Sequence, residues 1–366
     1  MSNCKFLEPL YIKKKLILYL IFLVLLHNNL MLKIGIVGFG YWGPNLVRNF
    51  SKIDECNVVA IVDRSIEQQR LVRKSYPQIS VYSEFSDLLT SAIDAVVIAT
   101  PVFTHFNLAR LALKAGKHVL LEKPMTSSLI ETIELKKIAD ENKLTLMVDH
   151  TFLYTGAVQK MKQLIEDNQL GKLQYFDSTR INLGLFQSDI NVLWDLAPHD
   201  ISILNYLVNK KAYSVNATGI SHIGNGIENI AYLTINYEDD FIAHLNCSWT
   251  SPVKVRSTLI GGDEKMLVYN DLEPTEKVRL YDSGYKLIEN TDLESIKVDY
   301  RIGDVYIPKL TTHEALYGVA MDFISSIKNS TKPLSDVLSG LSVVNILEAA
   351  QKSIKNKGEE IIIEWN

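Results

Sequence analysis

The segment 192-VLWDLAPHDIS-202 places four side chains that could take part in chemistry within seven residues: Trp194, Asp195, His199 and Asp200. Asp195 and His199 are four positions apart, a spacing that puts both on one face of a helix. A histidine with a pKa near neutrality can take a proton from a hydroxyl group, and a carboxylate can orient its ring and stabilise the cation. The same residues could instead bind a metal ion or form the polar start of a buried helix.

Pro198 and the apolar run that follows it indicate where this segment lies in a helix. Proline is tolerated in the first turn of a helix, so we predict a helix start here, with the regular part over 201–208. A metal site is the weakest of the three interpretations, because the segment supplies at most three ligands and no cysteine or second histidine lies nearby in the sequence. The choice between structure and catalysis depends on the rest of the chain.

Short apolar runs alternate with helical periods from Met31 onward. The runs are apolar throughout, which is typical of a parallel sheet covered by helices on both faces. We expect strands at 33–37, 56–62, 79–82, 95–100, 118–122 and 144–149, and helices at 44–52, 65–75, 104–115 and 128–142. Ser128 and Glu131 have the spacing of a capping box, and Gly116 stands where a left-handed residue after a helix is needed.

The pattern changes after residue 150. A helix at 156–169 precedes alternating runs at 172–183, 229–250 and 254–269, and helices at 313–327 and 339–355 lead to a last strand at 360–365. Consecutive alternating strands predict an antiparallel or mixed sheet. We therefore expect an α/β chain with an N-terminal Rossmann domain, a doubly wound parallel sheet over 31–150. A substrate-binding and oligomerisation α+β domain with a large open, mostly antiparallel sheet follows over 151–366, and its C-terminal helix and strand can pack back on the first domain.

A glycine-rich stretch, 38-GFGYWGPN-45, follows the first expected strand and opens a helix. Gly38 allows a tight turn, Gly40 lets the backbone approach a pyrophosphate, and Gly43 lets the helix pack close to the strand. Backbone N–H groups and the helix dipole would face the phosphates, with Tyr41 and Trp42 in the same loop. The strand–turn–helix context favours a dinucleotide site over an ordinary glycine-rich turn.

Asp63 ends the second expected strand, 20 residues beyond Gly43. A carboxylate at this position can bind both ribose hydroxyls of NAD, and its charge repels the 2′-phosphate of NADP. The adjacent Arg64 could accommodate that phosphate, so NADP remains the alternative. We predict NAD as the cofactor.

Two further loops, 99-ATPVFTH-105 and 122-EKPM-125, follow expected strands at the sheet edge where open α/β sheets bind ligands. The first would carry its backbone along the cofactor, and the second would point an ammonium group at the crevice. A lysine before a proline could also be a solvated loop residue. The cofactor-side residues expected from these loops are Thr100, Pro101, His105, Glu122 and Lys123.

In this order and spacing, GFGYWGPN, ATPVFTH, EKPM and WDLAPHD resemble the glucose–fructose oxidoreductase / inositol dehydrogenase / MocA (Gfo/Idh/MocA) family, over nearly all of Met31 to Asn366. The resemblance implies that Lys123 lies beside the nicotinamide and the reacting hydroxyl, and that Asp195 and His199 are the family's D-x-x-x-H pair, with His199 as the acid/base residue. Within the family, GYWGPN and WDLAPHD look most like the nucleotide-sugar 3-dehydrogenase branch. Residues 191–194 depart from the glycine-rich pattern before the aspartate, which leaves the substrate-side wall undefined.

These features predict an NAD-dependent oxidoreductase that acts on a secondary alcohol of a sugar ring. The expected substrate is a UDP-linked amino sugar, reacting at C3, in the biosynthesis of surface-polysaccharide precursors. His199 would take the hydroxyl proton, and Lys123 would stabilise the negative charge that develops on the same oxygen. A free-sugar or inositol dehydrogenase is the alternative, and a non-catalytic dinucleotide-binding sensor is the second. We expect no metal site.

The charge balance and the cysteines bear on partners and location. A net charge of −4, from 38 basic and 42 acidic side chains, gives no electrostatic footprint for nucleic acid. Cys4, Cys56 and Cys247 are widely spaced, which fits a reducing compartment, so we expect a cytoplasmic protein. The open sheet predicts a homodimer or homotetramer, because a monomer would leave a broad apolar face uncovered.

Residues 1–30 form an apolar N-terminal extension of different character. Three lysines at 13–15 precede an apolar run of 11 residues, Leu16 to Leu26, whereas a bilayer span takes ~20. The basic flank resembles a signal peptide, but the small-residue cleavage pattern is missing. We expect an upstream translation extension with Met31 as the natural start, rather than a signal or an anchor, and no membrane partner.

Overall fold

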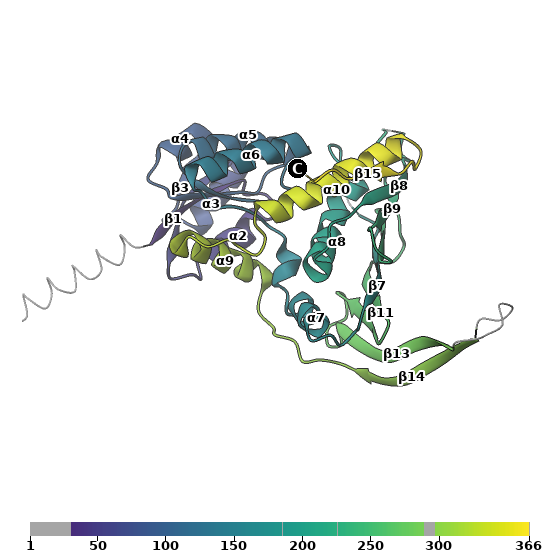
Figure 1. Cartoon of the computed structure of the whole chain (residues 1–366). Helices are drawn as coiled ribbons and strands as arrows, with labels where there is room; N and C mark the ends of the chain where they lie inside the picture. The colour runs from purple at the N-terminus through teal and green to yellow at the C-terminus, as the bar shows by residue number, and fades with distance from the viewer. Residues whose placement is uncertain (1–30, 185, 225, 289–296, 366) are drawn as a thin grey trace, which may run out of the picture. The chain divides into compact units, whose positions relative to one another are not determined.

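The computed structural model describes residues 31–184, 186–224, 226–288 and 297–365 (Figure 1). The apolar N-terminal extension, residues 1–30, lies outside the described residues. The chain divides into two compact units between Val97 and Ile98. Within the described ranges, none of the helices combines the length and the apolar character that crossing a bilayer requires.

The first unit alternates strands and helices as the apolar runs predict. Its elements are β1 (Leu32–Val37), α2 (Gly43–Phe50), β2 (Cys56–Val62), α3 (Ile66–Ser75), β3 (Ser80–Tyr82), α4 (Phe85–Thr90) and most of β4 (Ala95–Ile98). Strand β2 pairs in parallel with β1 and with β3. Ile34, Ile36 and Ile61 are fully buried, as expected where both faces of a sheet are covered. Helix α4 is the one element of this unit that the sequence pattern does not predict.

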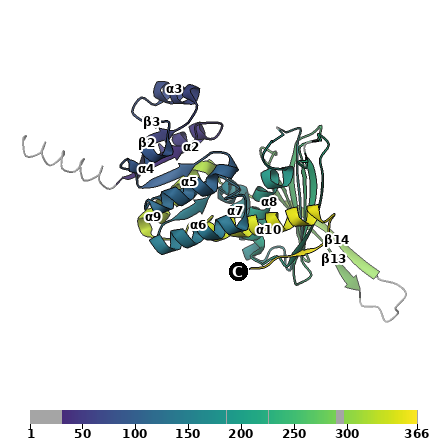
Figure 2. The ribbon, with the colours of Figure 1, turned by 90° about the horizontal axis from the view of Figure 1, so that it is seen from above.

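The second unit begins with α5 (Val102–Lys114), β5 (His118–Leu121), α6 (Leu129–Asn142) and β6 (Leu146–Val148). The first sheet has the strand order β3-β2-β1-β4-β5-β6, and this doubly wound arrangement confirms the predicted Rossmann architecture. Figures 1 and 2 both show α5 beside α6. The Ser128 hydroxyl accepts the Glu131 N–H at 3.5 Å, and Gly116 has a φ of 74°, so both predicted helix boundaries are confirmed.

A nine-stranded sheet dominates the rest of the second unit. Its strands are β7 (Leu173–Ile181), β8 (Ser214–Ile220), β9 (Ile230–Asn236), β10 (Ile242–Ser248), β11 (Val255–Gly262), β12 (Met266–Asn270), β13 (Val278–Ile288), β14 (Lys297–Tyr306) and β15 (Ile361–Ile362). The order is β14-β13-β12-β11-β7-β10-β9-β8-β15. In the described part of this sheet only β7 and β10 pair in parallel, so the predicted mostly antiparallel sheet is confirmed. The register shifts between Gly261 and Gly262, a glycine pair inside the alternating run 254–269 that favours a turn or bulge.

Helices cover one face of this sheet. The remaining helical elements are η1 (Thr151–Tyr154), α7 (Gly156–Glu166), α8 (Val192–Val208), α9 (Ala315–Asn329) and α10 (Val337–Lys355). Helix α8 packs on β7, β9 and β10, helix α10 packs on β8 as well as on α6 and β6, and Figure 2 shows both helices on the same side of the sheet. Leu233 and Leu245 face them and are fully buried, whereas Tyr232 and Ile242 point to the other face and are 48% exposed.

Helix α8 corrects the prediction made from Pro198. The helix begins at Val192, nine residues before the predicted regular part, and Pro198 lies inside it. Two interactions account for this: the Asn191 side chain caps the helix by accepting the Trp194 N–H at 3.1 Å, and an apolar face is fully buried. That face consists of Leu193, Ala197, Ile201 and Leu204. Its burial offsets the ~3 kcal/mol that an interior proline costs a helix.

Candidate active site

Lys123 and Asp195 form the centre of the site. Lys123 follows the end of β5, its peptide bond to Pro124 is cis, and Asp195 lies in the first turn of α8. The Lys123 ammonium donates to the backbone carbonyl of Asp195 at 2.8 Å and to its Oδ1 at 3.2 Å. Both side chains are largely buried, at 16% and 22% exposure. Because an ammonium has three N–H donors, one remains for a substrate oxygen.

Trp249, which directly follows β10, forms a hydrogen bond with the second carboxylate oxygen of Asp195. Its indole Nε1 donates to Asp195 Oδ2 at 3.1 Å, and the ring is buried against Phe186 at 5.6 Å between centroids. Both carboxylate oxygens of Asp195 are therefore used on Trp249 and Lys123. The ring-orienting contact that the sequence predicts between Asp195 and His199 is absent from the described residues, where the buried Nδ1 of His199 has no hydrogen-bond partner.

His199 lies one helical turn beyond Asp195, as their spacing predicts. The edge of its imidazole packs against Phe152 of η1, with ring centroids 5.0 Å apart and planes at 65°. Burial first, then the positive charges of Lys123 and Arg180, lower the pKa of His199 well below its usual value. The ring is therefore neutral at physiological pH, which is the form that can accept a proton.

Asp200, which the sequence leaves unassigned, is the partner of Arg180 on β7. The Arg180 Nε and Nη2 each donate to one Asp200 oxygen at 2.8 Å, and both side chains are buried. The guanidinium carbon also lies 4.7 Å from the centre of the Phe152 ring. Asp200 is therefore fully engaged in a bidentate ion pair. Within the described ranges, no three histidine, cysteine or carboxylate side chains are grouped so that they could hold a metal ion.

Two buried carboxyl groups, Glu122 and Asp149, lie near Lys123. Burial, together with the charge of Asp149, raises the pKa of Glu122 to about 8. Burial also raises the pKa of Asp149 to about 6, although the Thr151 hydroxyl donates to its Oδ1 at 2.5 Å and opposes the rise. The pair consequently retains a proton near neutral pH, since two close carboxylates in a buried site do not both ionise.

His150 is a second neutral imidazole close to Lys123. It is 1% exposed, and neither ring nitrogen has a hydrogen-bond partner among the described residues. Burial, and then the charge of Lys123, lower the pKa of His150 to about 3. Unpartnered buried nitrogens are costly, so His150 and His199 both carry polar atoms that the described residues leave unsatisfied.

His105 ties the two cofactor-side loops of the second unit together. Its buried ring lies between two carbonyl oxygens, with Nδ1 3.0 Å from Pro124 O and Nε2 2.8 Å from Thr100 O. Thr100 Oγ1 is 2.6 Å from Thr104 Oγ1, and Pro101 precedes α5. Both ring nitrogens of His105 therefore contact the protein. We infer that the residue positions the loops and does not itself touch a cofactor.

The glycine loop of the first unit has the form that a dinucleotide requires. Gly38 has a φ of 94°, and a Cβ on Gly43 would lie 2.7 Å from Gly38 O, so close packing of α2 requires glycine there. A Cβ on Gly40 would meet nothing within 4 Å, which leaves its backbone open to a ligand. The loop therefore fits a pyrophosphate at the start of α2.

Asp63 holds this loop in place. Its Oδ2 accepts the Phe39 N–H at 2.7 Å, and its Oδ1 accepts the Ser65 N–H at 2.8 Å. The remaining lone pairs can accept ribose hydroxyls. Tyr41, Trp42 and Arg64 are exposed around the loop, and their contribution to cofactor binding stays a prediction.

Sequence reasoning missed several residues that shape the site. Trp249 ends an alternating strand pattern, and nothing in that pattern points to a carboxylate 54 positions earlier. Arg180 and Phe152 likewise meet α8 only through the tertiary fold. Asp149 could have been found, because it follows β6 just as Glu122 follows the neighbouring β5, and the ends of parallel strands meet at one sheet edge.

Comparison with known proteins places the chain in a family. Residues 32–150 match the model described as "Oxidoreductase family, NAD-binding Rossmann fold", and residues 158–268 match the Gfo/Idh/MocA C-terminal domain. The chain therefore belongs to the Gfo/Idh/MocA oxidoreductases and is an NAD-binding dehydrogenase, as predicted.

Individual relatives agree with this assignment. A UDP-N-acetylglucosamine 3-dehydrogenase of Acidithiobacillus ferrooxidans is 27% identical over 212 residues, covering 56% of this chain and 64% of the relative. The structure of a UDP-N-acetylglucosamine 3-dehydrogenase from that organism has a TM-score of 0.75 at 21% identity, over 89% and 98% of the two chains. A levoglucosan dehydrogenase in complex with NADH has a TM-score of 0.78 at 18% identity, over 92% and 100%. The two structural matches support the fold.

Trp249→Phe tests whether the indole N–H positions Asp195 and, through it, Lys123. The variant keeps an aromatic ring but leaves Asp195 Oδ2 without its donor, so we expect kcat to fall about 10-fold, as for a lost hydrogen bond to a charged group. KM for NAD should not change. Phe186→Leu is the matched control, because it loosens the packing of Trp249 and keeps the N–H bond. Equal losses in the two variants would show that packing alone matters.

The raised pKa values of Glu122 and Asp149 predict a pH-dependent stability. Their usual pKa values are 4.5 and 3.8. Between about pH 4 and pH 8, these two groups therefore bind more protons in the folded protein than in the unfolded chain. This contribution to the free energy of unfolding is fully present below pH 4 and is lost as the pH rises through about 6 and about 8.

Urea unfolding of the wild type and of a Glu122→Gln/Asp149→Asn variant at pH 5 and pH 9 measures this effect. The wild type should lose more stability between the two pH values than the variant does. Comparison with the variant is needed because His150, with its lowered pKa, acts in the opposite direction. Its contribution to the free energy of unfolding of the protein increases as the pH rises. Asp140→Asn, which removes an exposed carboxylate paired with Lys136 at 2.6 Å, should keep the wild-type slope. Parallel slopes for all three proteins would contradict the prediction.

Proposed function

We propose that this enzyme oxidises or reduces a secondary alcohol of a sugar ring, and that its substrate is a UDP-linked amino sugar reacting at C3. The observation that carries the proposal is the pairing of Lys123 with Asp195, one helical turn before the neutral imidazole of His199. A proton acceptor and an N–H donor for the same oxygen are the two groups that alcohol oxidation requires.

His199 is assigned as the general base. In the oxidation direction it accepts the hydroxyl proton at a ring nitrogen while the C–O bond becomes C=O. Its buried Nδ1 has no hydrogen-bond partner among the described residues, so no contact of that atom with the protein competes with the uptake of a proton by the ring. In the reverse direction the protonated ring returns the proton to the carbonyl oxygen.

Lys123 is assigned to stabilise the reacting oxygen. Two of its N–H groups are fixed by Asp195, which aims the third. Asp195 is thus a positioning residue for Lys123, held in turn by Trp249. This replaces the ring-orienting role that the sequence suggests for Asp195.

In the first unit, the residues that would hold NAD are the glycine loop and Asp63; in the second unit, Thr100 and Pro101 keep their predicted role in cofactor binding. The open backbone at Gly40 and the fixed carboxylate of Asp63 fit the pyrophosphate and the ribose. Bound NAD supplies the acceptor for the hydride that leaves the alcohol carbon. Asp63 favours NAD over NADP through charge repulsion of a 2′-phosphate.

Stopped-flow absorbance at the reduced-nicotinamide band, with UDP-N-acetylglucosamine and its uronate as substrates, tests the assignment. We expect Lys123→Ala and His199→Ala each to lower the rate of the chemical step by ~10²–10⁴-fold. Arg110→Ala is a control, since Arg110 is a half-buried residue of α5 that pairs with Glu134 and is not one of the residues assigned to the site. Wild-type rates in both site variants would refute the assigned roles. Turnover of free sugars or inositols but not of UDP-sugars would indicate a free-sugar or inositol dehydrogenase. Binding of NAD without turnover of any sugar would indicate a non-catalytic dinucleotide-binding sensor.

We also propose that the chain forms a homodimer or homotetramer through the face of the nine-stranded sheet opposite α8. That face carries exposed Tyr232, Ile242 and Leu259, and Figures 1 and 2 show the two large helices on the other side. Light scattering at micromolar concentration should give at least twice the monomer mass of 41.4 kDa. Ile242→Lys should lower that mass, and a monomeric wild type would contradict the proposal.

The proposed setting is cytoplasmic biosynthesis of surface-polysaccharide precursors. Cys56 and Cys247 are free and buried, which suits a reducing compartment. The keto-sugar product has a carbonyl that an aminotransferase could consume. The genes beside this one, and fractionation of the native cells, test the setting independently of the catalytic roles.

A further inference from the structure

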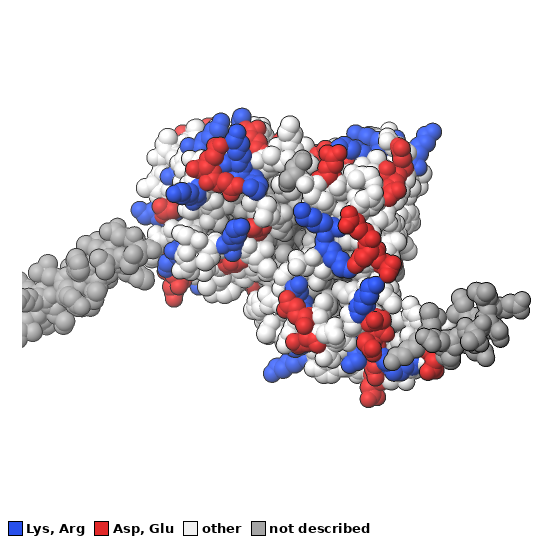
Figure 3. Space-filling view, in the orientation of Figure 1, with Lys and Arg blue, Asp and Glu red and all other residues white. Residues whose placement is uncertain are grey.

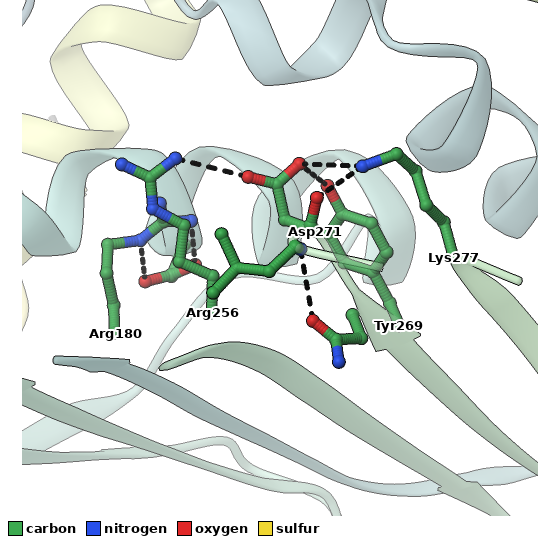
Figure 4. A network of polar contacts seen from close by, with 8 residues as sticks. Arg180, Arg256, Tyr269, Asp271 and Lys277 are labelled. Atoms are coloured by element: carbon green, nitrogen blue, oxygen red, sulfur yellow. Dashed lines mark hydrogen bonds and ion pairs between the residues drawn. The ribbon is translucent and has the colours of Figure 1, made fainter. Parts of the chain in front are cut away.

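We propose that Arg256, Asp271 and Lys277, here called the Asp271 cluster, bind an anionic group of the substrate. The proposal rests on the proposed function and names a feature of the substrate, a negative charge set apart from the reacting hydroxyl. It comes from the polar network drawn in Figure 4, which lies in the nine-stranded sheet outside the Lys123–Asp195–His199 group.

The cluster is built around one carboxylate. Arg256 Nη1 lies 3.2 Å from Asp271 Oδ2, and Lys277 Nζ lies 3.7 Å from Oδ1 and also donates to the Asp271 carbonyl. The Tyr269 hydroxyl donates to Oδ1 at 3.1 Å. Arg256 has five N–H donors, and its contacts in Figure 4 use one of the guanidinium nitrogens. The cluster therefore keeps donors that no group of the described residues occupies.

The charge of the cluster is not balanced internally. Two cations share the single Asp271 carboxylate, which leaves one net positive charge. The neighbouring Arg180–Asp200 pair, by contrast, joins one cation to one carboxylate through two bonds of 2.8 Å and is buried. Lys123 and Asp195 are also matched one to one. Among these three ion-pair groups, the Asp271 cluster is the one that an added anion would neutralise.

A cavity of about 670 Å³ adjoins the cluster. Tyr269, Asp271 and Lys277 line it together with the segment 308–315, in which Lys309 and Glu314 are of opposite charge. The first residues of α7 and α9 also line it, at Gly156, Ala157 and Ala315. The positive ends of two helix dipoles therefore face the same space as Lys277, and this space is large enough for part of a ligand.

Residues on neighbouring elements lie between the cluster and the catalytic group. Arg256 on β11 is directly opposite Arg180 on β7, so their side chains leave the sheet on the same face. Arg180 lies on the Phe152 ring at 4.7 Å, and Phe152 meets His199 at 5.0 Å. The Asp271 cluster therefore lies on the same face of the sheet as Arg180, whose contact partner Phe152 packs against His199, and we assign the cluster to a part of the substrate distant from the reacting hydroxyl.

Oxyanions are the ligands that suit a guanidinium and an ammonium together. Two sources fit the proposed substrate class: the diphosphate of a nucleotide sugar and the carboxylate of a uronate sugar. UDP carries the diphosphate without the carboxylate, and glucuronate carries the carboxylate without phosphate. These two probes separate the sources.

Calorimetric titration of the full-length protein, saturated with NAD so that the glycine loop is filled, measures binding without turnover. We expect UDP to bind at least about 10-fold more tightly than uridine, which lacks the diphosphate. Arg256→Gln and Lys277→Gln should each weaken UDP binding about 10-fold or more, as for the loss of a charged hydrogen bond. If glucuronate binds, its binding is weakened by both substitutions and UDP does not bind, the recognised group is the carboxylate.

Lys172→Gln is the matched control, because Lys172 is exposed and paired with Asp240 at 3.1 Å, and its loss should leave UDP binding unchanged. Arg256→Lys retains the charge for the case that Arg256→Gln does not fold. The proposal is overturned if both cluster variants bind UDP and glucuronate like the wild type, or if neither anion binds. An enzyme that binds UDP through Arg256 but turns over no sugar would remove the proposed function and leave the anion site standing.

Discussion

The pairing of the Lys123 ammonium with Asp195 is the interaction on which the site depends. It joins the end of a strand in the first sheet to the start of α8, across 72 positions of sequence. A largely buried ammonium is stable only with a partner, and Asp195 supplies both a carboxylate and a carbonyl oxygen. Because His199 follows one turn later on the same helix, the contact that fixes Lys123 also fixes where the imidazole stands relative to it.

Whether a group in the site is charged or neutral depends on how many oppositely charged or hydrogen-bonding partners it has. Arg180 and Asp200 are matched one to one through two hydrogen bonds, and the guanidinium also lies against the Phe152 ring. Glu122 and Asp149 avoid a second buried negative charge by retaining a proton, and the buried histidines stay neutral. On the face drawn in Figure 3, the basic and acidic side chains of the described residues lie interspersed.

Much of the fold could be predicted from sequence because its signals are local. Continuous apolar runs indicate the parallel strands, and the β2 range, 56–62, was predicted at its observed bounds. Gly261 and Gly262 marked a break in alternation that is a register shift in the sheet. Helix α4 has only six residues, too few to show a period. The start of α8 was wrong because Pro198 is a strong local signal, whereas the packing that overrides it is not local.

The sequence predicted which residues belong to the candidate site better than it predicted which of them contact one another. Spacing alone put Asp195 and His199 on one face, and the strand-end rule together with the family resemblance pointed to Lys123. The partner of Asp195 could not be found in this way, because the spacing of two residues on a helix does not show that a third residue, Trp249, reaches one of them from a strand. Tertiary hydrogen bonds of this kind leave no trace in periodicity or composition.

The chain of contacts from Trp249 through Asp195 to Lys123 also restricts how this sequence can diverge. Each residue satisfies a buried polar atom of the next, so a replacement at one position leaves an unpaired donor or acceptor at another. Asparagine at 195, for example, would lose the negative charge that pairs with Lys123. A leucine at 249 would leave Oδ2 of Asp195 without its hydrogen-bond donor. Positions 123, 195 and 249 are therefore expected to covary in related sequences, changing as a set although they lie on three separate elements of the chain.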